Sequence, residues 1–285
     1  MPRHRFAPGR PHWWQWATVL SLDAPAVALV WQAQFARTAH TSPGWAEAWV
    51  LGVSTWLAYA ADRWFEGWRL AVGRIRTQRH HFYHRWRWPI LGAWVVLGVS
   101  DVSVAWVRLP RAELLAGALL LGPVLLYLLS HQLLHRDRLW RVPKEICVAV
   151  LIAGGAAVFV LGANPPAWRL LLAPAGLFAL ACLTNCALIS AWEYEIDAIH
   201  GQRSLARQHG RHHPLIRALP WVLAVVAALF AAGGQPATRT PALALVGSGL
   251  LLGLIDLAES WLGWQLARVL ADAALLAPLA LSFAR

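Results

Sequence analysis

The sequence has little charge, few cysteines and almost no lysine. Only 14% of its 285 residues are Asp, Glu, Lys or Arg, against about 25% in an average soluble domain, while 58% are hydrophobic. The three cysteines, Cys147, Cys182 and Cys186, all fall in apolar segments, and neither a disulfide framework nor a zinc-binding pattern is present. All the basic residues but Lys144 are arginine, as in proteins from GC-rich bacterial genomes. This composition excludes an ordinary soluble domain.

Long apolar runs occupy most of the chain. A helix that crosses a bilayer needs about 20 apolar residues, and roughly nine runs approach or exceed that length. Many of the 19 tryptophans lie near the ends of these runs, as in the aromatic belts of membrane proteins. We therefore expect an all-α bundle of about nine transmembrane helices, forming one domain over 1–285. The runs cover 13–36, 44–64, 89–107, 112–130, 144–162, 167–191, 215–233, 241–258 and 265–284.

The basic residues predict the orientation of the bundle. If the amino terminus is cytosolic, 19 of the 25 Lys and Arg residues fall on the cytosolic side, as the positive-inside rule requires. The other six are Arg37, Arg108, Arg111, Arg169, Arg239 and Arg285. We expect an integral protein of a bacterial plasma (inner) membrane, with cytosolic loops at about 65–88 and 192–214 and the carboxyl terminus outside. This distribution also explains the net charge of +11 without a nucleic-acid partner. No signal-peptide cleavage site is evident, so we expect the first run to remain as a spanning helix.

Two acid pairs end hydrophobic helices on the cytosolic side. Asp62 and Glu66 form the first pair, and Glu193 and Asp197 form the second. The i,i+4 spacing places both carboxylates of a pair on one helix face. Charged side chains are costly in a membrane helix, and four converging carboxylates would repel one another. Divalent cations resolve both problems, and Mg²⁺ with a phosphate ligand fits this donor set best.

The two segments resemble the motifs of a known family. Ala-Asp-Arg-x-x-Glu at 61–66 is similar to the second half of the Asn-Asp-x-x-Asp-x-x-x-Asp motif of the UbiA superfamily of intramembrane prenyltransferases. The second acid pair and the Gly-x-Arg-Ser-Leu segment at 201–205 resemble the second motif of that superfamily. The resemblance implies Mg²⁺ bound through both motifs, a prenyl diphosphate held by the metal, and attack of an acceptor on the allylic carbocation. The isoprenoid tail would lie in an apolar cavity open to lipid.

The resemblance also assigns roles to particular residues. It makes Asp62, Glu66, Glu193 and Asp197 the catalytic metal ligands; a purely structural ion-pair role is the alternative. Three cations are candidates for binding the diphosphate, or else anchor the chain at the membrane surface: Arg63, Lys144 and Arg203. His80, His81 and His84, in an arginine-rich loop, would cover the site or contact anionic lipid headgroups.

The sequence departs from the family pattern in motif one. Ala58 and Tyr59 stand where the family has Asn and Asp, and glutamate replaces aspartate at 66 and 193. Tyr59, Asp101 and Asn185 are candidates for lining the cavity. For Asn185 the alternative is a hydrogen bond between helices, and Asp101, in the middle of a run, needs a partner or a neutral form. A buried Asp272 would pair with Arg268 by i,i+4 spacing.

Three functions remain open from the sequence. The first is Mg²⁺-dependent transfer of an isoprenyl group from a prenyl diphosphate to an unidentified acceptor within the membrane. The second is cyclisation of the isoprenoid by a UbiA-type terpene cyclase, with no acceptor. The third is a non-catalytic isoprenoid-binding membrane protein, which the changes at Ala58 and Tyr59 favour. A secondary transporter fits less well, because the acids cluster at one membrane face and not at the midplane.

Overall fold

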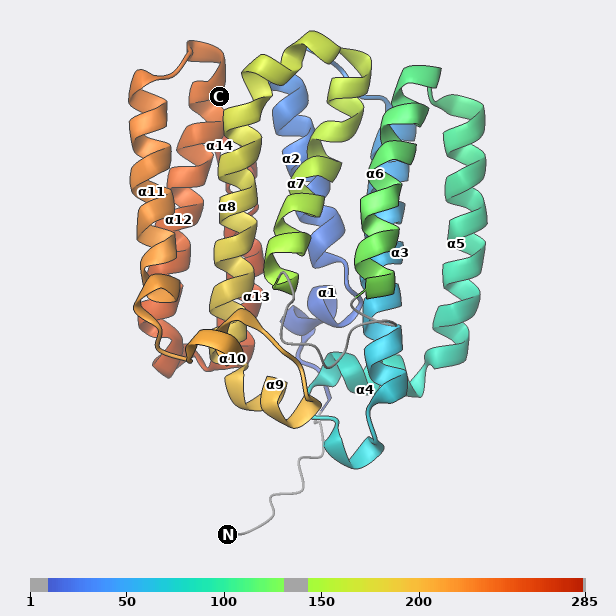
Figure 1. Cartoon of the computed structure of the whole chain (residues 1–285), viewed down its shortest axis with the longest axis vertical. Coiled ribbons are helices and arrows are strands. Elements are labelled where there is room, and N and C mark those ends of the chain that lie inside the picture. Colours follow the sequence, from blue (N-terminus) through green and yellow to red (C-terminus); the bar gives the residue numbers. More distant parts are fainter. Residues whose placement is uncertain (1–9, 131–142, 284–285) are drawn as a thin grey trace.

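The computed structural model describes residues 10–130 and 143–283, and over these ranges the chain forms helices and turns without a strand. The long helices run side by side as a bundle (Figure 1). Their bounds are α2 Asp23–Thr38, α3 Trp45–Arg69, α5 Arg87–Arg108, α6 Arg111–Leu129, α7 Lys144–Ala163, α8 Trp168–Trp192, α11 Pro214–Gly233 and α12 Pro236–Leu262. The shorter ones are α1 Trp16–Val19, α4 Gln78–Arg85, α9 Tyr194–His200, α10 Leu205–His209, α13 Trp264–Ala274 and α14 Ala277–Phe283. The expectation of an all-α bundle is confirmed.

Six of the helices are long and apolar enough to cross a membrane: α5, α6, α7, α8 with the turn before it, α11 and α12. A seventh span results if α1, with the turn before it, and α2 count as one, although the chain bends there by 78°. The expected count of nine is therefore not confirmed in the part of the chain that the structure describes. The run at 44–64 lies in α3, whose last turns carry Asp62, Arg63 and Glu66 and lower its hydropathy. The run at 265–284 is divided between α13 and α14 by a turn at Leu275 and Leu276.

Aromatic and small side chains hold the centre of the bundle together. Trp31 of α2 stacks on Phe178 of α8 with ring centroids 4.3 Å apart, and its indole donates to the carbonyl of Leu275 over 2.8 Å. Helices α11 and α12 approach so closely that a Cβ added at Gly249 would lie 2.8 Å from the Pro220 carbonyl oxygen. By contrast, α5 and α6 expose most of their apolar side chains, as helices facing lipid do.

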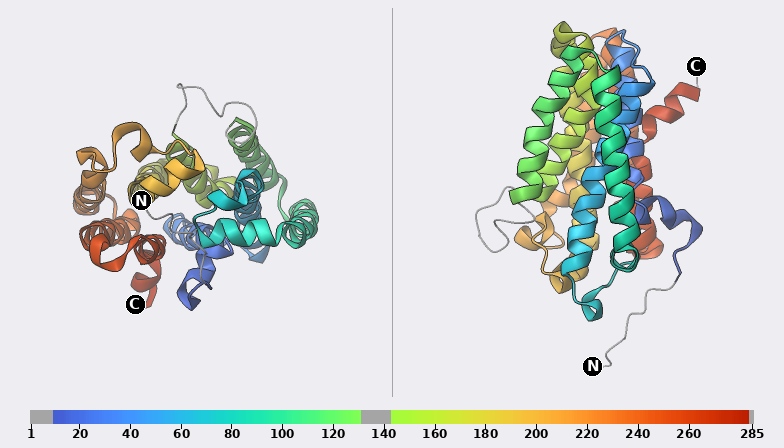
Figure 2. Two further views of the ribbon diagram at one scale, coloured as in Figure 1. Left: turned by 90° about the horizontal axis from the view of Figure 1, so that it is seen from below. Right: turned by 90° about the vertical axis from the view of Figure 1, so that its right-hand side faces the viewer.

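Short helices cover one end of the bundle. Helices α3 and α8 both end there, and α4, α9 and α10 lie across their ends (Figures 1 and 2). The segments expected as loops at about 65–88 and 192–214 are therefore largely helical. The Thr77 side chain caps α4 by accepting from the His80 backbone N–H, and Gly201, with φ of +67°, ends α9 in the left-handed conformation. The basic segment 136–144, whose Lys and Arg residues are among the 19 expected on the cytosolic side, falls mostly outside the described residues.

Candidate active site

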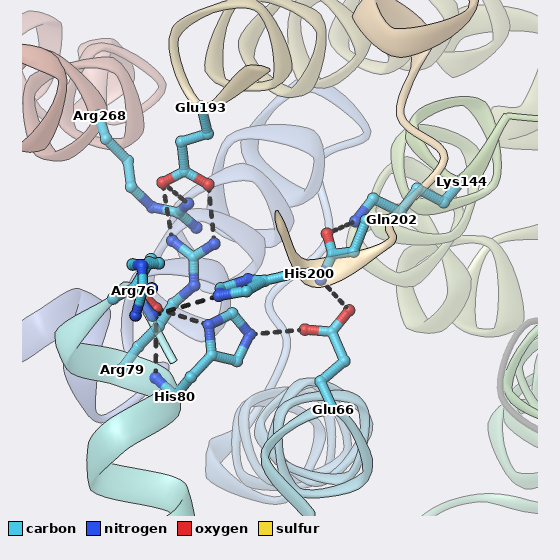
Figure 3. A network of polar contacts seen from close by, with 10 residues as sticks. Glu66, Arg76, Arg79, His80, Lys144, Glu193, His200, Gln202 and Arg268 are labelled. Atoms are coloured by element: carbon cyan, nitrogen blue, oxygen red, sulfur yellow. Dashed lines mark hydrogen bonds and ion pairs between the residues drawn. The ribbon is translucent and has the colours of Figure 1, made fainter. Parts of the chain in front are cut away.

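The fold brings the two acid pairs to the same end of the bundle. Asp62 and Glu66 lie on the last turns of α3. Glu193 lies at the break where α8 ends and α9 begins, and Asp197 lies on α9. The break keeps the i,i+4 relation of the second pair, because the Asp197 N–H donates to the Glu193 carbonyl over 2.8 Å. Figure 3 shows separate groups of polar contacts near each other, one around Glu193 and another around Glu66.

Each carboxylate oxygen of Glu66 has one hydrogen-bond partner among residues 10–130 and 143–283. His80 Nε2 lies 2.9 Å from Oε2, and Gln202 Nε2 donates to Oε1 over 2.8 Å. Lys144 Nζ in turn donates to the Gln202 side-chain oxygen over 2.7 Å. Gln202 follows α9, so these bonds join the end of α3 to the segment after the second acid pair and to the start of α7.

His80 holds Glu66 as a neutral ring. Burial lowers the pKa of the His80 imidazole to about 4, despite the opposing effect of its bond to Glu66. Its Nδ1 lies 2.5 Å from the Thr77 hydroxyl oxygen. A neutral ring that accepts from the Thr77 hydroxyl at Nδ1 carries its proton at Nε2 and donates it to Glu66. The Thr77–His80 pair thereby fixes the orientation of the Glu66 carboxylate.

Glu193 is bound by two arginines. Arg79 of α4 forms a two-pronged ion pair with it, Nη1 to Oε1 at 2.9 Å and Nη2 to Oε2 at 2.8 Å. Arg268 of α13 adds a third bond, Nη1 to Oε1 at 2.7 Å. Burial alone would raise the pKa of the Glu193 carboxyl, but Arg268 and Arg79 hold that pKa well below its ordinary value. The carboxylate ties α8 to α4 and to α13.

Asp197 is buried and forms no such ion pair with the residues that the structure describes. Only 4% of its surface is exposed, and this burial raises the pKa of its carboxyl to about 6, although Lys144 acts in the opposite direction. Lys144 interacts electrostatically with Glu66 and Asp62 as well as with Asp197. It is therefore the cation around which three of the four motif acids are arranged.

The acids at this end of the bundle differ in how well they suit Mg²⁺. Mg²⁺ prefers carboxylate oxygens and keeps several water ligands. Glu66 suits this role, since each of its oxygens accepts one hydrogen bond and keeps a lone pair, and since ligating carboxylates are normally held by such bonds. Glu193 suits it less in this arrangement, because two arginine N–H groups occupy its Oε1 and a third binds its Oε2. Among the described residues, no three His, Cys, Asp or Glu side chains form a ready-made metal cage.

The three cations predicted to bind diphosphate differ in their placement. Arg63 is buried on α3, with its guanidinium 6.0 Å from the centre of the Tyr59 ring. Lys144 is the first residue of α7 and lies within the network around Glu66. Arg203 is exposed just before α10. This position favours an anchor at the membrane surface over a residue that binds diphosphate. Diphosphate binding by Arg63 and Lys144 stays a prediction.

The structure gives two of the predicted cavity residues partners between helices. Asp101 is buried on α5, where it accepts from the Ser54 hydroxyl of α3 over 2.6 Å. Asn185 donates to Asp272 of α13 over 3.2 Å, which is the helix–helix hydrogen bond considered as its alternative. Tyr59 is half-buried beside Arg63.

Several residues of the network have no clear signal in the sequence. Arg79 lies 114 positions before Glu193, and Gln202 lies 136 positions after Glu66, so no local spacing connects them. Arg268 was expected to pair with Asp272, and the two side chains do interact electrostatically, but in the described structure the direct partner of Arg268 is Glu193 and Asp272 accepts from Asn185. His80 was expected to cover the site, and it does contact Glu66.

Comparisons with known proteins agree with this architecture. No protein-family model matches the chain, and a search of curated protein sequences gives no match. Among solved structures, the chain is similar to the apo structure of a UbiA homolog from Aeropyrum pernix K1. The two share 16% sequence identity and superpose with a TM-score of 0.55. The alignment covers 92% of this chain and 98% of the other. At this identity the likeness concerns the fold, and the chain has a UbiA-like fold.

Proposed function

We propose that this protein is a UbiA-type intramembrane prenyltransferase, which transfers an isoprenyl group from a prenyl diphosphate to an acceptor. One observation supports this most: two acid pairs 127 or more positions apart in the sequence lie at one end of the bundle, where Gln202 joins them by donating from its side chain to the Glu66 carboxylate and from its backbone N–H to the Asp197 carbonyl. The UbiA-like fold and the resemblance of both motifs support the same function. The distribution of Lys and Arg favours a site at the cytosolic face of a bacterial inner membrane.

The residues divide into three roles. Asp62, Glu66 and Asp197 would hold Mg²⁺, which when bound offsets the charge on the diphosphate. Lys144 and Arg63 would supply fixed positive charge to the diphosphate oxygens. Glu193 would join the metal ligands only if its bonds to the two arginines were exchanged for others.

Two residues position Glu66 in this proposal. His80 and Gln202 each hold one of its oxygens, and they come from different segments, so the carboxylate is fixed from two sides. Such outer partners orient ligating carboxylates and typically change metal affinity by about 10- to 100-fold when removed. The Gln202 side chain also accepts from the Lys144 ammonium, so one residue positions both Glu66, the proposed metal ligand, and Lys144, the proposed diphosphate-binding cation.

A second candidate function is isoprenoid binding without chemistry. The engagement of Glu193 by Arg79 and Arg268 favours it, since it removes one of the four acids from the expected metal set. The presence of Ala58 and Tyr59, where the family has Asn and Asp, also favours a non-catalytic protein. Cyclisation without an acceptor is a third outcome of the same fold.

The test uses purified full-length protein with Mg²⁺ and a panel of radiolabelled prenyl diphosphates of different chain lengths. Diphosphate release and ligand binding are measured together. Substitution of Asp62→Asn or Asp197→Asn should abolish Mg²⁺-dependent release, because each removes a ligating charge without changing side-chain volume. The matched control is Glu195→Gln, since Glu195 is an exposed acid on the same short helix as Asp197.

The outcomes separate the three functions. Release that both aspartate variants lose, and the control keeps, supports an enzyme; products with and without added acceptors then separate transfer from cyclisation. Binding without release under any acceptor supports the non-catalytic protein. Near-normal release in both aspartate variants contradicts the proposed site.

A further inference from the structure

One short segment carries the residue that joins Glu66 to Lys144. It runs over 201–206, from the end of α9 into the start of α10, and we call it the connecting segment. Its Gln202 side chain donates to Glu66 over 2.8 Å and accepts from Lys144 over 2.7 Å (Figure 3). Whether Gln202 reaches both partners therefore depends on where the backbone of this segment is held.

Hydrogen bonds hold the backbone of the connecting segment on both sides of Gln202. On the side of α9, the Gln202 N–H donates to the Asp197 carbonyl over 2.8 Å, a bond within the same stretch of chain. On the side of α10, the Leu205 N–H donates to the side-chain oxygen Oε1 of Glu145 over 2.9 Å. Glu145 lies on α7, 60 positions earlier, so this second bond attaches the segment to a long helix of the bundle.

The bond from Leu205 supplies an acceptor that α10 needs. The first N–H groups of a helix have no partner inside it, and the side chain of the preceding residue often accepts from one of them. Ser204 precedes α10, but its side chain does not cap the helix. Glu145 accepts from the first N–H of α10 instead. Ser190 of α8 accepts from the next N–H, that of Ala206, over 3.3 Å, so α7 and α8 together fix the start of α10.

Packing alone does not account for a glutamate at position 145. The residue is 3% exposed, and its Oε2 has no hydrogen-bond partner within 10–130 and 143–283. Its neighbour Lys144 interacts with it electrostatically, but the Lys144 ammonium donates to Gln202. A carboxylate buried in this way is costly, whereas an apolar side chain of similar size is not. The hydrogen bond to Leu205 is the contact that an apolar side chain could not make.

We propose that Glu145 is a positioning residue of the candidate active site: it holds the connecting segment, and thereby Gln202, in place beside Glu66. This role rests on the proposed function, in which Glu66 is a metal ligand and Lys144 binds the diphosphate. Glu145 holds the segment by its backbone, while the residue before it, Lys144, binds the Gln202 side chain. Glu145 acts through Gln202 and does not itself contact the metal or the diphosphate.

Two substitutions at position 145 separate this role from that of a further metal ligand. Glu145→Leu fills a similar volume and removes the acceptor for the Leu205 N–H. Glu145→Gln loses the negative charge but keeps a side-chain oxygen that can accept from the same N–H. The matched control is Glu113→Leu, because Glu113 is also a first-turn glutamate of a long helix and is 5% exposed. The start of its helix, α6, lies at the opposite end of the bundle (Figure 1).

A third variant, Leu205→Pro, removes the same hydrogen bond from the donor side and leaves Glu145 in place. Proline suits the first position of a helix, where its missing N–H has no partner inside the helix. Ser204, the residue before it, is already extended with φ of −85° and ψ of 166°, as a residue before proline should be. This variant keeps the test valid if Glu145→Leu does not fold.

The experiment has two readouts on full-length protein in detergent. The first is hydrogen–deuterium exchange of peptides covering 201–209, without Mg²⁺ or substrate. The second is diphosphate release, from which kcat, KM for the prenyl diphosphate and the Mg²⁺ concentration at half-maximal rate are obtained. We expect Glu145→Leu and Leu205→Pro to exchange faster over 201–209 and to need about tenfold more Mg²⁺, at the lower end of the effect of partners that orient metal ligands. Glu145→Gln and Glu113→Leu should match wild type in both readouts.

The proposal is overturned if either readout stays at the wild-type level in both Glu145→Leu and Leu205→Pro. It is also overturned if Glu145→Gln loses release while 201–209 keeps its protection, because the carboxylate charge would then act directly at the metal. If wild type releases no diphosphate, the proposed function fails. The exchange pattern alone then supports or overturns the role of Glu145 in holding Gln202, so the two failures are distinguishable.

Discussion

Removal of Glu193 tests whether its carboxylate serves the ion pairs or a metal. In Glu193→Ala, Arg79 and Arg268 remain buried with no carboxylate between them. Their side chains are 8% and 10% exposed and that of Glu193 is 4% exposed, so the two guanidinium groups have little access to water that could replace the lost partner. Breaking a buried ion pair from one side typically costs about 3–5 kcal/mol. We expect a loss of stability of this size in the absence of any metal.

The loss should be visible in thermal unfolding. At roughly 2–4 °C per kcal/mol for chains of a few hundred residues, about 3 kcal/mol corresponds to a fall in Tm of roughly 6–12 °C. The measurement is made in detergent with EDTA, and repeated with Mg²⁺ and diphosphate. Glu195→Ala, an exposed acid two positions away, is the control and should change stability by less than about 0.5 kcal/mol. The double variant Glu193→Ala/Arg268→Leu should recover part of the loss, because one uncompensated charge has gone.

Two results would refute this reasoning. A Tm for Glu193→Ala within about 1 °C of wild type in EDTA would mean that the ion pairs carry no net stability. A loss that appears only with Mg²⁺ and diphosphate would mean that Glu193 is a metal ligand, as the sequence motif predicts. Only the second result would return Glu193 to the metal site; the first would refute the stability estimate alone.

Three further perturbations test other parts of the structure. Burial lowers the pKa of His80 to about 4, from roughly 6.5 in the unfolded chain, so the contribution of this side chain to stability should be complete above about pH 6.5 and fall by roughly 3 kcal/mol towards pH 4. Asp197, whose pKa is raised to about 6, changes stability in the opposite direction, so the measurement is the difference in unfolding free energy between wild type and His80→Gln at several pH values. Ser54→Ala removes the donor to buried Asp101 and should cost about 1–3 kcal/mol in thermal unfolding, whereas addition of Asp101→Leu should restore stability by removing the unpaired acid. Gly249→Ala should destabilise by about 1–3 kcal/mol, because its Cβ would meet backbone atoms at 2.8–3.1 Å, and Gly247→Ala, with 3.9 Å of clearance on the same helix, should not.

The parts of the fold that were predictable depend on residues close together in the sequence. A run of apolar residues predicts a membrane helix, and i,i+4 spacing places two acids on one face, with no knowledge of distant segments. The all-α bundle was predicted on this basis. The nine-helix count was not confirmed, because it assumed that every run continues as one straight apolar helix. The bend before Asp23 and the turn at Leu275 depend on packing against other helices, which the apolar pattern does not encode.

The sequence by itself determined the class of protein, the side of the bundle that carries the charge and the two acid pairs, since composition and local spacing fix all three. The tertiary structure decided what those acids contact. Glu193 and Arg268 are 75 positions apart, and Glu66 and Gln202 are 136 apart. From the sequence alone, any basic or amide side chain at the acid-bearing end of the bundle is a possible partner of these acids. Packing brought α4 and α13 against the end of α8, so Glu193 meets two arginines, while Glu66 keeps the lone pairs that a metal ion needs.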